Sequence, residues 1–135
     1  MLKSVFYVSV KATPWPHDGL DVETITEVAR SRNASLGVTG ALISTDNHFA
    51  AVLEGPPAAI DAVMASIFRD ARHWRVTVLE ETDLAERVFQ SWSSAFAGRG
   101  SLVDVRITPR LLNVPPDPAD VRQLMELIRA FGRTS

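Results

Sequence analysis

Residues 38–54 read VTGALISTDNHFAAVLE, and this stretch decides the fold class. Two runs rich in apolar and β-branched residues, 38–45 and 49–54, flank the short polar connection DNH at 46–48. Strand-like runs joined by a few polar residues are typical of an antiparallel β-hairpin. We therefore predict a hairpin here, and the GPP at 55–57 ends its second strand.

A strand and a helix are predicted before this hairpin. Alternating β-branched and aromatic residues over 2–10 predict a strand that carries Tyr7 on one face and Phe6 on the other. Apolar residues at helical spacing then predict a helix over 22–32 that frays near 33–37. The helix would pack its apolar face on the sheet.

A second helix and two strands are predicted after the hairpin. The apolar stripe of that helix, over 58–72, follows the spacing i, i+3, i+4, i+7 and i+8 and consists of Ile60, Val63, Met64, Ile67 and Phe68. The runs 76–80 and 91–97 predict the two strands, although serines dilute the pattern of the second. The order of elements up to this point is βαββαββ.

A last helix is predicted near the C-terminus. Asp117 and Pro118 form an N-cap followed by proline at the first helical position, and Gly132 is placed to end the helix. Its apolar stripe consists of Val121, Leu124, Met125, Ile128 and Phe131. This stripe must find a groove on its own domain or on a partner.

The predicted fold class is α+β: a ferredoxin-like βαββαββ sandwich with one mixed sheet, two helices on one face and an additional C-terminal helix. The sequence shows no repeat and no second core. We therefore expect one domain over 1–98 and a helical extension over 99–135 that packs on the same domain. The length of 135 residues and the 46% hydrophobic content suit one globular core.

Composition excludes several classes of function. The net charge of −2 and the lack of a basic stripe argue against nucleic-acid binding. No apolar run approaches the roughly 18 residues of a membrane span, and no signal-peptide pattern opens the chain, so we expect a cytoplasmic protein without membrane contact. The absence of cysteine excludes disulfides, thiolate metal sites and a cysteine nucleophile.

Catalytic and metal-binding motifs are also missing. The sequence has no nucleophile and base pair, no phosphate-binding glycine loop and no dinucleotide fingerprint, so we expect no enzymatic activity. The three histidines, His17, His48 and His73, lack the spacing of metal ligands, so we expect no metal site. The acidic residues over 80–86 are explained as a solvated strand end and turn.

A few polar residues stand where apolar ones were expected, and each has two interpretations. Asn33 either caps the first helix in a left-handed conformation or points its amide between the two helices toward a planar heterocycle. Tyr7 either fills the core or donates an electron and a proton to a ligand above the sheet. Asp70, Arg72 and His73 either complement the second helix dipole or contact a polar ligand tail.

These residues together resemble the BLUF family, the flavin-dependent sensors of blue light. The resemblance covers about residues 2–97. It rests on five motifs in order: YVS at 7–9, RN at 32–33 followed by GVTGAL at 37–42, FAAVLEG at 49–55, DARH at 70–73, and RVFQSW at 87–92. Any one of them alone is weak evidence, whereas their order and spacing are specific.

The resemblance implies that FAD lies between the two helices, over the sheet. Asn33 would hydrogen-bond the polar edge of the flavin ring, and the other cofactor-binding positions would be Arg32, Ile25, Phe49, Ile67, Asp70, Arg72 and His73. It assigns the photochemistry to Tyr7, with Trp92 nearby. In the family, a glutamine between the tyrosine and the flavin rearranges its hydrogen bonds after excitation.

Three positions depart from the family pattern. Ala51 stands where the photoactive glutamine belongs, and Ser94 stands where methionine is usual. Arg32 replaces the asparagine or histidine that often precedes the flavin-binding asparagine. Since alanine has no polar side-chain atom, we expect the usual light-driven hydrogen-bond switch to be absent or altered.

Two hypotheses on function follow. The first is a BLUF-type sensory module that binds FAD, signals to an unknown downstream protein and forms a homo-oligomer. The second is a flavin-free, light-independent interaction domain that dimerises through its sheet and C-terminal helix. A third reading, an acylphosphatase-type hydrolase, rests on analogy of fold alone.

Overall fold

The computed structural model describes residues 1–11, 31–44, 48–69, 73–96 and 118–134. In chain order its elements are β1 (Leu2–Lys11), β2 (Thr39–Ser44), β3 (His48–Gly55), α2 (Pro57–Arg69), β4 (His73–Leu84), β5 (Trp92–Phe96) and α4 (Pro118–Thr134). Residues 31–36 are also helical.

All five strands form a single sheet with the order β4-β1-β3-β2-β5. The pairs β1·β3, β1·β4 and β2·β3 are antiparallel, whereas β2 and β5 are parallel. The antiparallel pairing of β2 and β3 confirms the predicted hairpin. The mixed sheet and its helices confirm the α+β, ferredoxin-like class.

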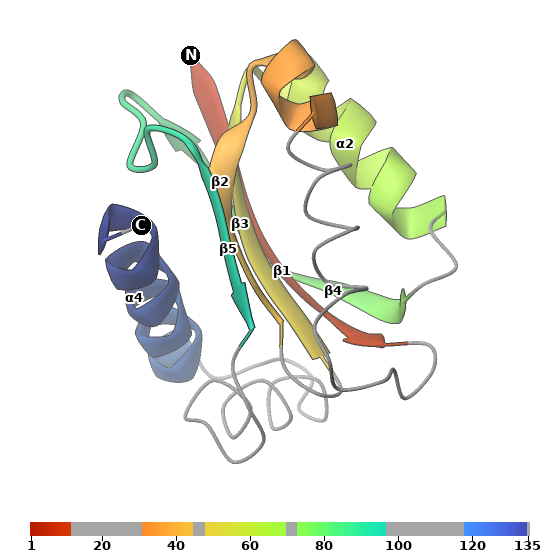
Figure 1. Cartoon of the computed structure of the whole chain (residues 1–135), viewed down its shortest axis with the longest axis vertical. Helices are drawn as coiled ribbons and strands as arrows, with labels where there is room; N and C mark the ends of the chain where they lie inside the picture. The colour runs from red at the N-terminus through yellow and green to blue at the C-terminus, as the bar shows by residue number, and fades with distance from the viewer. Residues whose placement is uncertain (12–30, 45–47, 70–72, 97–117, 135) are drawn as a thin grey trace.

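Helices cover both faces of this sheet (Figure 1). The helical residues 31–36 and α2 lie on one face, and α4 lies on the other. Strand alternation sends neighbouring side chains to opposite faces, so β1 serves both cores, as the sequence predicted. Below, the two sides are called the α2 face and the α4 face.

The core of the α2 face combines three strands with α2. Its buried members are Val5, Tyr7, Val38, Leu42, Phe49, Ala51, Leu53, Ile60, Val63, Met64 and Ile67. Four of the five predicted stripe positions of α2 are therefore in the core. The fifth, Phe68, is 59% exposed, so its prediction as a core residue is wrong. The helix turns this ring outward because positions 60, 63, 64 and 67 already fill the contact with the sheet.

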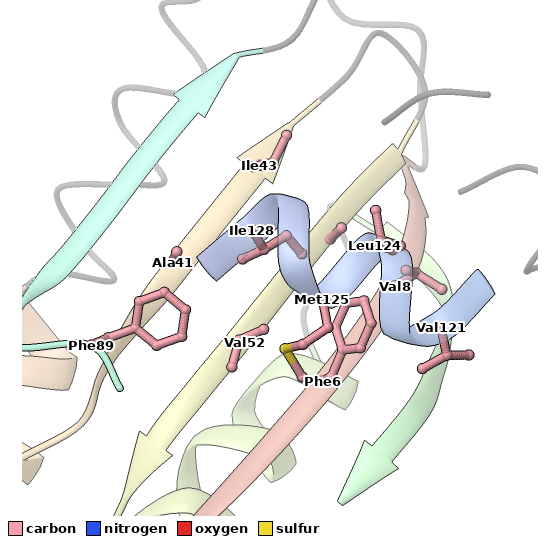
Figure 2. Close-up of a cluster of buried hydrophobic side chains, with 11 residues drawn as sticks. Phe6, Val8, Ala41, Ile43, Val52, Phe89, Val121, Leu124, Met125 and Ile128 are labelled. Atoms are coloured by element: carbon pink, nitrogen blue, oxygen red, sulfur yellow. The ribbon is translucent and has the colours of Figure 1, made fainter. Parts of the chain in front are cut away.

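The core of the α4 face is built by the other side chains of the same strands and by α4 (Figure 2). Val121, Leu124, Met125 and Ile128 of α4 are all buried against strand residues that include Phe6, Val8 and Val52. The C-terminal helix thus packs on its own sheet, which was one of the two predicted alternatives.

Strand β4 is longer than the predicted 76–80. It runs the length of β1, which it pairs from Leu2↔Leu84 to Lys11↔His73, with two register shifts. Glu81 and Asp83 therefore lie within a strand and not in a turn. An edge strand tolerates such charges, because only one side of its backbone is paired and its side chains reach solvent. One bulge contains Arg75, which has a φ of 51°.

Two helix ends also differ from the prediction. Residues 33–36 do not fray, since the first helix continues to 36 and Gly37, with a φ of 72°, takes the left-handed conformation after it. Glycine adopts this conformation without steric cost, so it ends the helix in place of Asn33. Helix α4 continues through Gly132 to Thr134, because one glycine near a helix end costs only about 1 kcal/mol.

An ion-pair network joins β1, β4 and α2 at one end of the sheet. Lys3 Nζ lies 2.9 Å from Asp61 Oδ1 of α2 and also contacts Glu81 of β4. Hydrogen bonds to Glu81 and Asp61 raise the pKa of Lys3. In the part of the chain that the structure describes, no helix is long and apolar enough to cross a membrane.

Candidate functional site

The α2 face gathers most of the described residues that the sequence singled out. Tyr7, Phe49, Ala51 and Ile67 are buried in its core, and Trp92 packs partly buried against it. Tyr7 is 6% exposed and Ala51 is fully buried. Residues from four separate elements therefore line one layer between the sheet and α2.

Strand register sets the neighbours of Ala51. Across β3, Ala51 pairs with Tyr7 of β1 on one side and with Leu42 of β2 on the other. Leu42 in turn pairs with Ser94 of β5. Two of the three positions that depart from the family pattern, Ala51 and Ser94, thus share one row with the predicted photochemical tyrosine across four strands.

Asn33 is fully buried in the helical segment on the same face. Its Oδ1 accepts a hydrogen bond from Arg32 Nε at 3.4 Å, while its Nδ2 has no hydrogen-bond partner among the described residues. Because Asn33 is helical, its predicted role as a left-handed cap is wrong. The alternative prediction, an amide available to a ligand, is compatible with the unpaired Nδ2.

The C-terminal end of this helix is fixed to the sheet. Val38 N donates to the Asn33 carbonyl oxygen at 2.8 Å. Arg87 donates from Nη2 to the carbonyl of Gly37 at 2.7 Å, and from Nη1 to Thr39 Oγ1 at 2.7 Å and to the carbonyl of Glu54 at 3.1 Å. Arg87 therefore holds the segment that carries Asn33 against β2 and β3.

Trp92 contributes a second buried donor without a partner among the described residues, its indole Nε1. Its register partner on β2 is Gly40. A Cβ atom at Gly40, where φ is 152°, would lie 1.9 Å from the carbonyl oxygen of Val52, so no other residue fits. Because position 40 is glycine, no side chain lies beside Trp92 on β2.

The donor chemistry of this face fits a flavin. Asn33 Nδ2 and Trp92 Nε1 both offer N–H groups, and buried N–H groups without an acceptor are rare. A flavin ring carries carbonyl oxygens and ring nitrogens that accept hydrogen bonds, and its apolar part suits a layer containing Phe49 and Ile67. The residues present are thus compatible with the cofactor that the resemblance implies.

Some predicted residues are outside this description. Ile25, Asp70 and Arg72 lie outside the described residues. His73 begins β4 and Ser94 lies within β5, but only their backbone is described. For these five positions, the predicted contacts with a ligand stay predictions.

Glu54 is a buried polar group for which the sequence patterns predicted no role. Its side chain is fully buried on β3, and its Oε1 accepts hydrogen bonds from the backbone N–H groups of Val88 at 2.9 Å and Phe89 at 2.8 Å. Burial raises the pKa of the Glu54 carboxyl, although the bonds from Phe89 and Val88 and the charges of Arg129 and Arg87 oppose this shift. The sequence signal for a buried carboxylate was a glutamate at the end of the apolar run 49–54.

Comparison with known proteins supports the same assignment. The family model described as "BLUF: Sensors of blue-light using FAD" matches residues 2–95. The beta subunit of photoactivated adenylate cyclase from Euglena gracilis is 34% identical over 90 residues, which are 67% of this chain and 10% of that protein. The chain therefore spans about a tenth of the length of this relative.

Solved structures of other proteins match the fold of this chain. The dark-state structure of BlrB, a BLUF protein, matches with a TM-score of 0.74 and 29% identity over 96% of both chains. BlrP1 from Klebsiella pneumoniae, in a calcium and cyclic di-GMP complex, matches with a TM-score of 0.70 and 26% identity over 98% of this chain and 35% of that one. Since the family model covers most of the sequence, the chain belongs to the BLUF family, the sensors of blue light using FAD.

Proposed function

We propose that this BLUF domain binds FAD on the α2 face, between α2 and the helical segment that carries Asn33. The single observation that supports this proposal best is the Nδ2 atom of Asn33, which is buried without a partner among the described residues. Leaving a buried donor unpaired costs about 1–3 kcal/mol, and an acceptor on a ligand would recover this free energy.

The proposed roles follow from the chemistry of each side chain. Asn33 would donate to the polar edge of the flavin, while Phe49 and Ile67 exclude water from its apolar part. Trp92 would offer its indole N–H, and the buried Tyr7 would serve as the donor of an electron and a proton. When bound, FAD supplies absorption of blue light and an electron acceptor.

Further contacts are proposed for the residues around this centre. The side chains of Ile25, Asp70, Arg72 and His73 would complete the binding of FAD, as the family resemblance implies. Arg32 would contribute through Asn33, whose Oδ1 accepts a hydrogen bond from Arg32 Nε.

Ala51 would prevent the usual storage of the light signal. The methyl group of Ala51 is fully buried and pairs across the strands with Tyr7, so it offers neither a donor nor an acceptor beside the phenol. We propose that Tyr7 still quenches the excited flavin by electron transfer. After this electron transfer, position 51 has no side-chain amide that could hold a changed hydrogen-bond arrangement once illumination ends.

We propose that the domain passes its signal to an effector. The cyclase activity in the name of the Euglena gracilis relative belongs to a protein of which this chain matches about 10%. We propose that this chain senses without catalysing, that its signal reaches an unidentified partner or a second copy of the chain, and that it works in the cytoplasm. A cysteine-free sequence is compatible with that compartment.

An absorption spectrum tests the proposal directly. The purified protein is measured alone and after incubation with FAD and gel filtration, before and after blue illumination. We expect flavin absorption to co-elute with the protein. We also expect the spectrum recorded after blue illumination to match the spectrum recorded before it. The variant Asn33→Ala should retain less FAD, whereas the exposed Ser35→Ala on the same helix should retain as much as the wild type.

The opposite results have clear meanings. A protein that stays colourless after incubation with FAD would refute the proposal and favour the flavin-free interaction domain. A reversible red shift of the flavin absorption in the wild type would refute the part of the proposal that concerns Ala51.

A further inference from the structure

One arginine links the two helices of the α2 face. Arg32 Nη1 donates to Ser66 Oγ of α2 at 3.3 Å, a contact between residues 34 positions apart. Arg32 Nε donates to Oδ1 of the adjacent Asn33 at 3.4 Å. The planar guanidinium group therefore spans from α2 to the side chain of Asn33.

The chemistry of this arginine determines which end of the Asn33 amide faces it. A guanidinium group has five N–H donors and no acceptor, so only the oxygen of the amide can face it favourably. The NH₂ group of a planar carboxamide then points to the other side. In Asn33 this group is the buried Nδ2 that has no partner among the described residues.

We propose that Arg32 is a positioning residue that fixes the amide orientation of Asn33, so that Asn33 meets its ligand as a hydrogen-bond donor. The proposal rests on the proposed FAD site, and it refines that site: the ligand atom opposite Asn33 must be an acceptor, such as a ring carbonyl oxygen. Without Arg32, the amide could rotate and present either its oxygen or its nitrogen.

Variants at position 32 separate the effect of Arg32 on the orientation of the Asn33 amide from the effect of its positive charge. Arg32→Lys keeps the positive charge but loses the Nε donor and the fork that reaches two acceptors, and Arg32→Met loses both. Ser66→Ala removes only the anchor on α2 and leaves Arg32 in place. Ser35→Ala is the matched control, because Ser35 Oγ donates to the backbone carbonyl of Arg32 at 2.7 Å and does not contact the Asn33 amide.

Two readouts are measured on each variant. The first is ¹⁵N relaxation of the Asn33 side-chain amide in flavin-free protein, which reports whether the carboxamide is held in one orientation. The second is the dissociation constant for FAD. We expect a mobile amide and about five- to tenfold weaker FAD binding in both position-32 variants, as loss of one oriented hydrogen bond implies. Ser66→Ala should show a smaller change in the same direction, and Ser35→Ala none.

Two results would overturn the proposal. If Arg32→Lys keeps both an ordered amide and the wild-type affinity, the guanidinium fork of Arg32 is not what orients Asn33. If the amide of Arg32→Met stays ordered, some other group orients it. The flavin-free readout also separates this proposal from the FAD site: an amide ordered by Arg32 in a protein without affinity for FAD would refute the site and still confirm the positioning.

Discussion

Tyr7 and Ala51 are register partners across β1 and β3, and both are buried on the α2 face. The neighbour of the phenol on the central strand is therefore a methyl group. In this row, position 51 lies between Tyr7 of β1 and Leu42 of β2. A polar side chain at position 51 would therefore be a direct neighbour of Tyr7. The register thus identifies position 51 as the place where a substitution would put an amide beside Tyr7.

Ala51→Gln should give the FAD-loaded protein a reversible red shift of flavin absorption after blue light. The new amide can exchange hydrogen bonds beside Tyr7, which alanine cannot do. Because position 51 is fully buried, the larger side chain should lower the free energy of unfolding of the flavin-free protein by about 1–3 kcal/mol. Spectra recorded before and during illumination and during dark recovery measure the shift.

Two controls accompany Ala51→Gln. Ala51→Leu has a similar size without an amide and should show no shift, and Tyr7→Phe in the Ala51→Gln background should abolish it. A shift in the leucine variant, or none in FAD-loaded Ala51→Gln, would show that the missing amide is not what limits the photocycle.

Substitution of Glu54 should distinguish its hydrogen bonds from its charge. Glu54→Gln keeps an oxygen that can accept from Val88 N and Phe89 N, whereas Glu54→Ala leaves both donors without this acceptor. We expect Glu54→Ala to lower the free energy of unfolding by about 2–4 kcal/mol, and Glu54→Gln to change it by about 1 kcal/mol or less near pH 5. Urea denaturation measures both, and equal losses in the two variants would contradict this assignment.

The raised pKa of Glu54 predicts a pH dependence of stability. Because burial raises the pKa, the folded protein binds this proton more tightly than the unfolded chain does. The contribution of Glu54 to stability is therefore fully present below the unfolded pKa of about 4.3, and it is lost as the pH rises through the folded pKa. The stability of the wild type minus that of Glu54→Gln should thus fall as the pH rises above about 4.3.

Urea denaturation of both proteins across a pH series measures this difference. Since the other titratable groups are common to both proteins, their contributions cancel to a first approximation. A difference that is flat, or that increases with pH, would show that the folded protein does not hold the Glu54 proton more tightly.

Substitution of Arg87 should loosen the helix end that carries Asn33. Arg87 donates to the carbonyl of Gly37, to Thr39 Oγ1 and to the carbonyl of Glu54, and a lysine ammonium cannot reach three such acceptors with the same fork. We expect Arg87→Met to lower the free energy of unfolding by about 2 kcal/mol and Arg87→Lys by somewhat less.

FAD affinity should decrease together with stability in these variants, because Gly37 follows the helical residues that include Asn33. Arg122→Met removes an arginine exposed on α4 and serves as the control. Wild-type stability in Arg87→Lys would mean that the three hydrogen bonds contribute little.

Local patterns predicted the class of every described strand and helix. Alternation along β1 assigned its side chains to the two faces, and helical spacing identified the buried stripe of α4, because both periods depend only on neighbours in the chain. The errors lie at ends of elements. Strand β4 is longer than predicted because β1 provides a partner along its whole length, and this pairing is not encoded in the local pattern of 76–80.

The chemistry of the site was only partly visible in the sequence. The residue types at positions 7, 33 and 92 supported the family resemblance, and the comparisons confirmed the family. The role of Arg32 toward Ser66 was not predictable, because the two residues are 34 positions apart and meet only when both helices lie on the same face. The hydrogen-bond partners of Glu54, Val88 and Phe89, are likewise 34 and 35 positions away.

The sequence by itself determined the elements, the two faces of the first strand, the family resemblance and the lack of a side-chain amide at position 51. Only the tertiary structure decided the strand order β4-β1-β3-β2-β5, the row that joins Tyr7, Ala51 and Ser94, and the burial of the Asn33 amide with an unpaired Nδ2. The physical reason is the range of the interactions. Propensity and periodicity act between neighbours, whereas register, burial and hydrogen-bond partners depend on segments that are distant in the chain and come together only in the folded sheet.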